Sequence, residues 1–139
     1  MAVVVDASLL VVLVSADPRR PAVEGRMRAW LEAGEELHAP ELLPYEIASG
    51  LTRLASGGVL PAERVEETWR SAMAVPITYH PLRADGAQVV QIALGLARKS
   101  AYDAAYLALA RRLAAPLWTF DGPLARHARE RGYMVQLLA

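Results

Sequence analysis

The chain has 139 residues, of which 54% are hydrophobic and 22% are charged, a composition that provides one packed core and excludes a disordered chain. Fifteen basic and fifteen acidic residues give a formal net charge of zero, which excludes nucleic-acid binding through a generally cationic surface. The absence of cysteine excludes disulfides, thiolate zinc sites, iron–sulfur clusters and a cysteine nucleophile.

The first predicted strand is a run of three valines, residues 3–5, that ends at Asp6. Its apolar residues do not alternate with polar ones, which is typical of a strand buried on both faces of a parallel sheet. Four later apolar runs, most of them bounded by Pro, Gly or Asp, also predict strands. The five predicted strands cover residues 2–5, 36–39, 76–79, 117–120 and 134–136.

Helical spacing of apolar residues fills the segments between these strands. Ser8 is a good N-cap for the first helix, and Gly34 ends the second. The alternation of strands and helices predicts a single α/β domain over residues 1–139, with three layers and a mostly parallel sheet. The predicted helices cover residues 9–13, 21–31, 43–54, 61–73, 83–98, 102–115 and 123–131.

Four acids lie at or near one edge of this predicted sheet. Asp6 and Asp121 follow the first and fourth strands, so both should lie at the carboxyl ends of the strands, where ligands bind in open α/β sheets. Glu46 lies in an otherwise apolar helix, and Asp103 begins a helix whose inner face continues through Leu107. We therefore expect all four carboxyl groups to lie close together.

Such a cluster predicts a site for a divalent cation. A buried carboxylate without a partner is very unfavourable, and converging carboxylates raise each other's pKa. A divalent cation removes this conflict. Mg²⁺ and Mn²⁺ prefer oxygen ligands and keep some of their waters, which leaves positions for a phosphate oxygen and an attacking water.

Each acid also has a structural interpretation. Asp6 is suited to cap the turn that follows it, and Asp121 is a common turn residue before Gly and Pro. Asp103 gains about 0.3–1 kcal/mol from the dipole of the helix that it begins. Glu46 is harder to explain in this way, because its neighbours are apolar. The occurrence of all four together favours the metal site.

The segments around these acids resemble the four motifs of the PIN-domain ribonucleases, specifically the VapC toxins of toxin–antitoxin systems. The resemblance covers essentially the whole chain, and the four motifs occur in the family's order. It implies a three-layer α/β/α PIN-like domain with a central sheet of about five strands. The four segments are residues 4–8 (VVDAS), 40–46 (PELLPYE), 100–110 (SAYDAAYLALA) and 119–124 (TFDGPL).

The resemblance implies a metal-dependent endoribonuclease that cleaves RNA phosphodiesters with Mg²⁺ or Mn²⁺. The family's acidic cluster corresponds to Asp6, Glu46, Asp103 and Asp121. We expect Asp6 and Asp103 to be the most direct metal ligands, and the other two acids to bind a second ion or orient the water.

Two hydroxyl side chains are candidates to support this cluster. Ser8 and Thr119 are placed to hydrogen-bond a carboxylate or a water on the metal. For Ser8, a plain helix cap is the alternative. Lys99, beside the third motif, is a candidate contact for the RNA backbone, with a solvated charge as the alternative.

The resemblance further implies a cognate antitoxin and a homodimer, for which the apolar helices between Leu43 and Met73, with Trp69, are the predicted contact surface. The longest apolar run, residues 9–14, is far shorter than the roughly 20 residues of a membrane-spanning helix. The N-terminus also lacks a basic leader, so we expect a cytoplasmic protein with no membrane partner.

Other classes of protein fit less well. A phosphoacceptor signalling domain needs two acids after the first strand and a lysine after the last one, whereas here Asp6 stands alone and the single lysine precedes a helix. A dehalogenase-type phosphatase needs an aspartate where Ser8 stands. The remaining alternative is a PIN fold that binds RNA or a partner with little or no turnover.

Overall fold

The computed structural model describes residues 1–98 and 101–138, and it contains a five-stranded parallel sheet with the strand order β3-β2-β1-β4-β5. β1 lies in the centre, so its valines are covered on both faces, as the unbroken apolar run predicts. The strands are β1 (Ala2–Val5), β2 (Glu36–Pro40), β3 (Thr78–His80), β4 (Leu117–Thr119) and β5 (Val135–Leu137).

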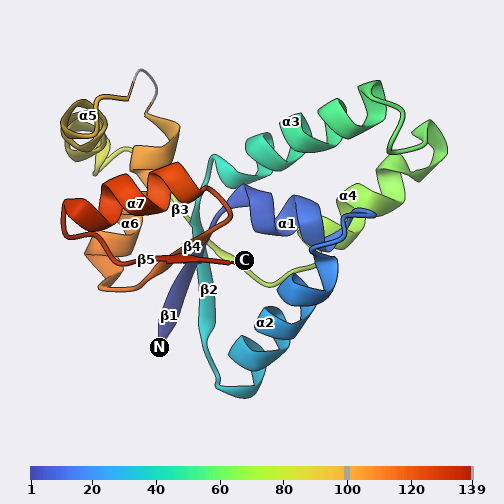
Figure 1. Ribbon diagram of the computed structural model, residues 1–139, viewed down its shortest axis with the longest axis horizontal. Helices are drawn as coiled ribbons and strands as arrows, with labels where there is room; N and C mark the ends of the chain where they lie inside the picture. Colours follow the sequence, from blue (N-terminus) through green and yellow to red (C-terminus); the bar gives the residue numbers. More distant parts are fainter. Residues whose placement is uncertain (99–100, 139) are drawn as a thin grey trace.

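Helices cover both faces of this sheet. Figure 1 shows α1 to α4 on one side of the sheet and α5 to α7 on the other, which confirms the predicted three-layer α/β/α fold. None of the helices in the described residues is long and apolar enough to cross a membrane. The helices are α1 (Ala7–Leu13), α2 (Arg20–Glu32), α3 (Leu43–Ser56), α4 (Val65–Met73), α5 (Gly86–Gly95), α6 (Tyr102–Leu113) and α7 (Gly122–Glu130), with a 3₁₀ turn, η1, at Ala62–Arg64.

The structure corrects several predicted boundaries. α1 begins at Ala7, and its N-cap is Asp6 rather than Ser8, because the Asp6 carboxylate accepts a hydrogen bond from the Ser8 backbone N–H. β3 begins two residues and ends one residue later than predicted, at Thr78–His80, where it pairs with β2. α5 is shorter than predicted. It ends at Gly95 with Leu96 as its C-cap, and Ala97, whose φ of 55° lies in the left-handed region, cannot continue the helix.

Two close packing contacts fix the positions of the helices α3 and α6, whose first turns carry Glu46 and Asp103. Gly50 of α3 lies directly against α1, since a Cβ at this position would be 2.8 Å from Val11 Cγ2. In α6, seven consecutive residues from Ala104 to Ala110 are buried, and the helix packs on β1, β2 and β4. These contacts bring the first turns of α3 and α6 to the carboxyl ends of the strands.

Two of the three histidines form a pair that the sequence does not reveal. His38 Nδ1 of β2 lies 2.8 Å from His80 Nε2 of β3, and Arg112, which forms an ion pair with Asp85, lies 3.0 Å from His80 Nδ1. A guanidinium only donates hydrogen bonds, so His80 Nδ1 accepts, and neutral His80 donates through Nε2 to His38. Burial, and then His38 and Arg112, lower the pKa of His80.

This arrangement predicts a loss of stability in mild acid. The pKa of His80 is lowered on folding, so the unfolded chain takes up the proton first as the pH falls through about 6.5, and the folded state is disfavoured. The melting temperature of wild type should therefore fall more between pH 7.5 and 5.5 than that of His80→Asn, whose amide oxygen can still accept from Arg112. Equal pH profiles for the two proteins would contradict this interpretation.

Candidate active site

Asp6 is held at the end of β1 by Thr119 of the neighbouring strand. The fully buried Thr119 hydroxyl donates to Asp6 Oδ2 at 2.7 Å and accepts from the Asp121 backbone N–H at 3.0 Å. The Ser8 N–H lies 3.4 Å from Asp6 Oδ1. Burial raises the pKa of Asp6, although the hydrogen bonds from Thr119 and Ser8 act in the opposite direction. Thr119 thus links two of the predicted acids.

Glu46 is held by a residue that the sequence analysis missed. The hydroxyl of the buried Tyr106 in α6 donates to Glu46 Oε1 at 2.5 Å. Burial raises the pKa of Glu46, and the charges of Asp6 and Asp103 raise it further. Burial and the bond to Glu46 also raise the pKa of Tyr106. Tyr106 lies three residues after Asp103 and thus on the same helix face, a signal that could have identified it.

Asp103 and Asp121 begin the two helices α6 and α7. Asp103 Oδ2 lies 3.5 Å from Arg98 Nη1 in a loose ion pair. Burial raises the pKa of Asp103, Arg98 lowers it, and the charges of Asp6 and Asp121 raise it. Asp121 is exposed and caps α7 by accepting from the Leu124 N–H at 2.9 Å, so it has a structural role at the start of that helix.

The four predicted acids therefore form one electrostatic group at the carboxyl edge of the sheet. The charges of Asp6 and Asp103 raise the pKa of Glu46, and the charges of Asp6 and Asp121 raise the pKa of Asp103. Each carboxylate also has its own protein partner. Within residues 1–98 and 101–138, no three Asp, Glu or His side chains are arranged to hold one metal ion. The fold brings the acids together without converging their oxygens on one point.

The chemistry of this group suits a hard divalent cation. The donors are carboxylate oxygens, the ligands that Mg²⁺ and Mn²⁺ prefer. Burial raises the pKa of Asp6, Glu46 and Asp103, and the charges of neighbouring acids raise those of Glu46 and Asp103 further, so a cation between them would relieve an unfavourable arrangement of charge. The buried Ser8 hydroxyl helps to lower the pKa of Asp6, yet it makes no hydrogen bond of good geometry within the described residues. It is therefore available to a further polar group.

Two cavities open beside Glu46, which lines both. One, of about 370 Å³, contains Asp6 and Ser8. The other, of about 510 Å³, contains Tyr45 and Tyr102. Both cavities are therefore continuous with the acidic group, and they provide room for a substrate.

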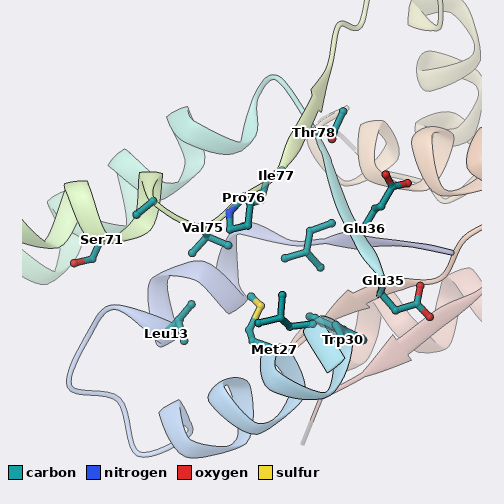
Figure 2. Close-up of a pocket in the computed structure, with 13 residues that line it drawn as sticks. Leu13, Met27, Trp30, Glu35, Glu36, Ser71, Val75, Pro76, Ile77 and Thr78 are labelled. Atoms are coloured by element: carbon teal, nitrogen blue, oxygen red, sulfur yellow. The ribbon is translucent and has the colours of Figure 1, made fainter. Parts of the chain in front are cut away.

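A larger pocket, of about 710 Å³, lies elsewhere. Figure 2 shows it between α2 and the segment that leads into β3, with Met27, Trp30, Val75 and Ile77 in its wall. It lies at the amino ends of β2 and β3, opposite the acids, and its lining is mostly apolar. Its size therefore does not make it the candidate active site.

One sequence candidate lies outside the described residues. Lys99, the candidate contact for the RNA backbone, and Ser100 of the third motif are not among residues 1–98 and 101–138, so the structure does not test the prediction for Lys99.

The sequence matches known families over most of its length. Residues 3–130 match the model of the PIN domain. The chain is 35% identical to Ribonuclease VapC3 of Pyrobaculum aerophilum over 132 residues, covering 90% of this chain and 93% of the relative. It is 38% identical to VapC ribonuclease Mb0985 of Mycobacterium bovis over 122 residues, covering 86% and 85% of the two chains.

Solved structures share this fold. The crystal structure of PAE2754 from Pyrobaculum aerophilum has a TM-score of 0.67 at 22% identity, over 91% of this chain and 87% of the other. Mycobacterium tuberculosis VapC20 has a TM-score of 0.62 at 18% identity, over 94% and 95%. At these identities the likeness shows the fold alone. The family model and the curated relatives together show that the chain belongs to the PIN domain family, among its VapC-type members.

Proposed function

We propose that this protein is a metal-dependent endoribonuclease that cleaves RNA phosphodiesters as the toxin of a toxin–antitoxin pair. The observation that carries the proposal is the group of four carboxylates at the carboxyl edge of the sheet, in which the charges of neighbouring acids raise the pKa of Glu46 and of Asp103. The names of VapC3 and Mb0985 as ribonucleases support it, and VapC20 is described as a Sarcin-Ricin loop cleaving toxin. A single PIN domain over residues 1–139 would carry the activity.

In this proposal, Asp6 and Asp103 are the most direct ligands of Mg²⁺ or Mn²⁺, with Glu46 and Asp121 beside them. When bound there, the ion would supply Lewis-acid polarisation of the phosphate and a lowered pKa for the attacking water. Thr119 keeps Asp6 oriented through its hydrogen bond to Oδ2.

Glu46 has the features of a general base. Its raised pKa brings it closer to the pH at which a carboxylate both stays ionised and takes a proton efficiently. Tyr106 occupies Oε1, which leaves Oε2 to accept a proton from the attacking water. Arg98, loosely paired with Asp103, is a cation that could turn to the charge on the phosphate.

The first test is cleavage of total tRNA by the purified chain in Mg²⁺, in Mn²⁺ and in EDTA. Asp6→Asn and Asp103→Asn should each reduce the rate at least about 100-fold, beyond the 10–100-fold typical of losing an outer-shell partner. Glu24→Gln, which removes an exposed carboxylate of α2, is the matched control and should cleave like wild type. Cleavage that survives both aspartate substitutions would contradict the assignment of the acids.

A second candidate function is a PIN fold that binds RNA or a partner with little or no turnover. Two observations favour this second function. Each of the four carboxylates already has its own partner within the protein, and no three acidic or histidine side chains of the described residues are arranged to hold a metal ion. RNA binding by wild type with no cleavage in any metal would support this candidate over the nuclease.

Metal binding should also raise the thermal stability. The pKa values of Asp6, Glu46 and Asp103 are raised on folding, so the stability contributed by these groups is present at low pH and is lost as the pH rises through the raised values. A cation bound between the carboxylates would stabilise their ionised form and offset this loss. Mg²⁺ or Mn²⁺ should therefore raise the melting temperature by a few degrees, about 2–8 °C for each kcal/mol. The same shift in Asp6→Asn and Asp103→Asn would place the metal elsewhere.

We also propose that RNA, a cognate antitoxin and a second copy of this chain are its partners, and that it acts in the cytoplasm, where RNA is found. The segment from Leu43 to Met73 remains our proposed contact surface. Trp69 packs partly against the core, whereas Val65, one turn earlier in α4, is exposed. Val65 is therefore the better position at which to disturb the surface without disturbing the fold.

If this surface mediates self-association, Trp69→Glu and Val65→Glu should each shift wild-type dimers toward monomers, because a buried carboxylate is unfavourable in an apolar contact. Light scattering after size exclusion measures the shift, and circular dichroism reports the fold. Leu31→Ala, at an exposed position of α2, is the control. An unchanged dimer in folded Val65→Glu would exclude this surface.

A further inference from the structure

The exposed aromatic side chains of this protein are gathered at one place. Of its nine aromatic residues, Tyr45 and Tyr102 are the two that are exposed, by 78% and 63%, and the others are buried or half-buried. Both tyrosines line the cavity of about 510 Å³ beside Glu46. An exposed apolar group at a hollow of the surface marks a binding site more often than an isolated one does.

The two tyrosines come from different helices and flank the acidic group. Tyr45 immediately precedes Glu46 in α3, and Tyr102 immediately precedes Asp103 at the start of α6. Successive residues of a helix point about 100° apart, so each ring lies beside its acid rather than over it. The cavity that both tyrosines line therefore adjoins the acidic group at Glu46.

A cation completes this cavity. Arg53 lines both cavities beside Glu46, and its charge lowers the pKa of Glu46. It is exposed, and no carboxylate of the described residues forms an ion pair with it. Arg53 follows Glu46 by seven residues, two helical turns, and so lies on the same face of α3. An exposed guanidinium with no ion pair among the described residues suits a phosphate group.

We propose that this cavity binds an unpaired nucleotide of the RNA next to the scissile phosphodiester, with its base stacked on Tyr45 or Tyr102 and a phosphate on Arg53. The inference deepens the proposed ribonuclease function and rests on it. A base in a duplex has both faces covered by its neighbours, so it cannot stack on a protein ring without being unstacked first. The preferred substrate is therefore single-stranded or looped RNA.

The charge of the chain agrees with this mode of binding. A net charge of zero provides little general attraction for RNA. Stacking on aromatic rings does not depend on net charge and contributes to the binding of any base, because every base has a π-face. Two rings and one arginine at the mouth of the site can therefore retain RNA where bulk charge does not.

The test measures RNA binding separately from cleavage. The probe is a short single-stranded RNA that carries 2-aminopurine, whose fluorescence falls when it stacks, and the protein is the full chain with Asp6→Asn. Tyr45→Ala and Tyr102→Ala in this background should weaken binding about tenfold or more and diminish the fluorescence change. The Phe substitutions should restore both, since phenylalanine also stacks. Leu94→Ala removes an equally exposed side chain of α5 and serves as the control.

Cleavage by otherwise wild-type proteins provides a second measurement. The two alanine variants should raise KM with little change in kcat, because they remove substrate binding and leave the carboxylates intact. A matched duplex should bind more weakly than the single strand. Equal binding of duplex and single strand, or alanine variants that bind like their parent, would overturn the inference.

The two proposals fail in different ways. If wild type cleaves RNA in a metal-dependent manner and the tyrosine variants behave like wild type, the ribonuclease stands and the stacking site is wrong. If the single strand binds with a tyrosine-dependent fluorescence change and no metal supports cleavage, the stacking site stands and the ribonuclease proposal is wrong.

Discussion

Repulsion among carboxylates at the carboxyl edge of the sheet is the constraint on which the site depends. Asp6 directly follows the strand β1 and Asp121 directly precedes the helix α7, whereas Glu46 and Asp103 lie in the first turns of α3 and α6. The fold satisfies this arrangement by giving each acid its own partner. Two of these partners, Thr119 and Tyr106, are buried, so the apolar core holds the donors that orient the acids.

The scaffold supports this arrangement by close packing. Gly50 lets α3 lie against α1, and the alanines of α6 let that helix lie close to the sheet. A larger side chain at either contact would move a helix whose first turn carries an acid, because well-packed interiors do not absorb extra volume freely. Gly50 and the buried alanines of α6 thus help to position the site, although their side chains carry no polar atom.

Tyr106 and the histidine pair show where prediction from sequence ends. The acids were recognisable because each occurs in apolar company at a strand end or helix start. From its sequence position, Tyr106 is predicted only as a core residue of α6. Hydrophobic periodicity indicates that a helix face is buried, but it does not indicate which polar group the tyrosine hydroxyl contacts. His38 and His80 are 42 positions apart and become neighbours only through the pairing of β2 with β3.

The sequence by itself determined the fold class, the parallel sheet and the four acids, because hydrophobic periodicity and the punctuation of strands by Pro, Gly and Asp are local properties of the chain. The tertiary structure decided which groups meet: Thr119 with Asp6, Tyr106 with Glu46, and the two exposed tyrosines in one cavity. These contacts join residues of separate elements. Their geometry depends on how the helices pack on the sheet, and no local pattern records that packing.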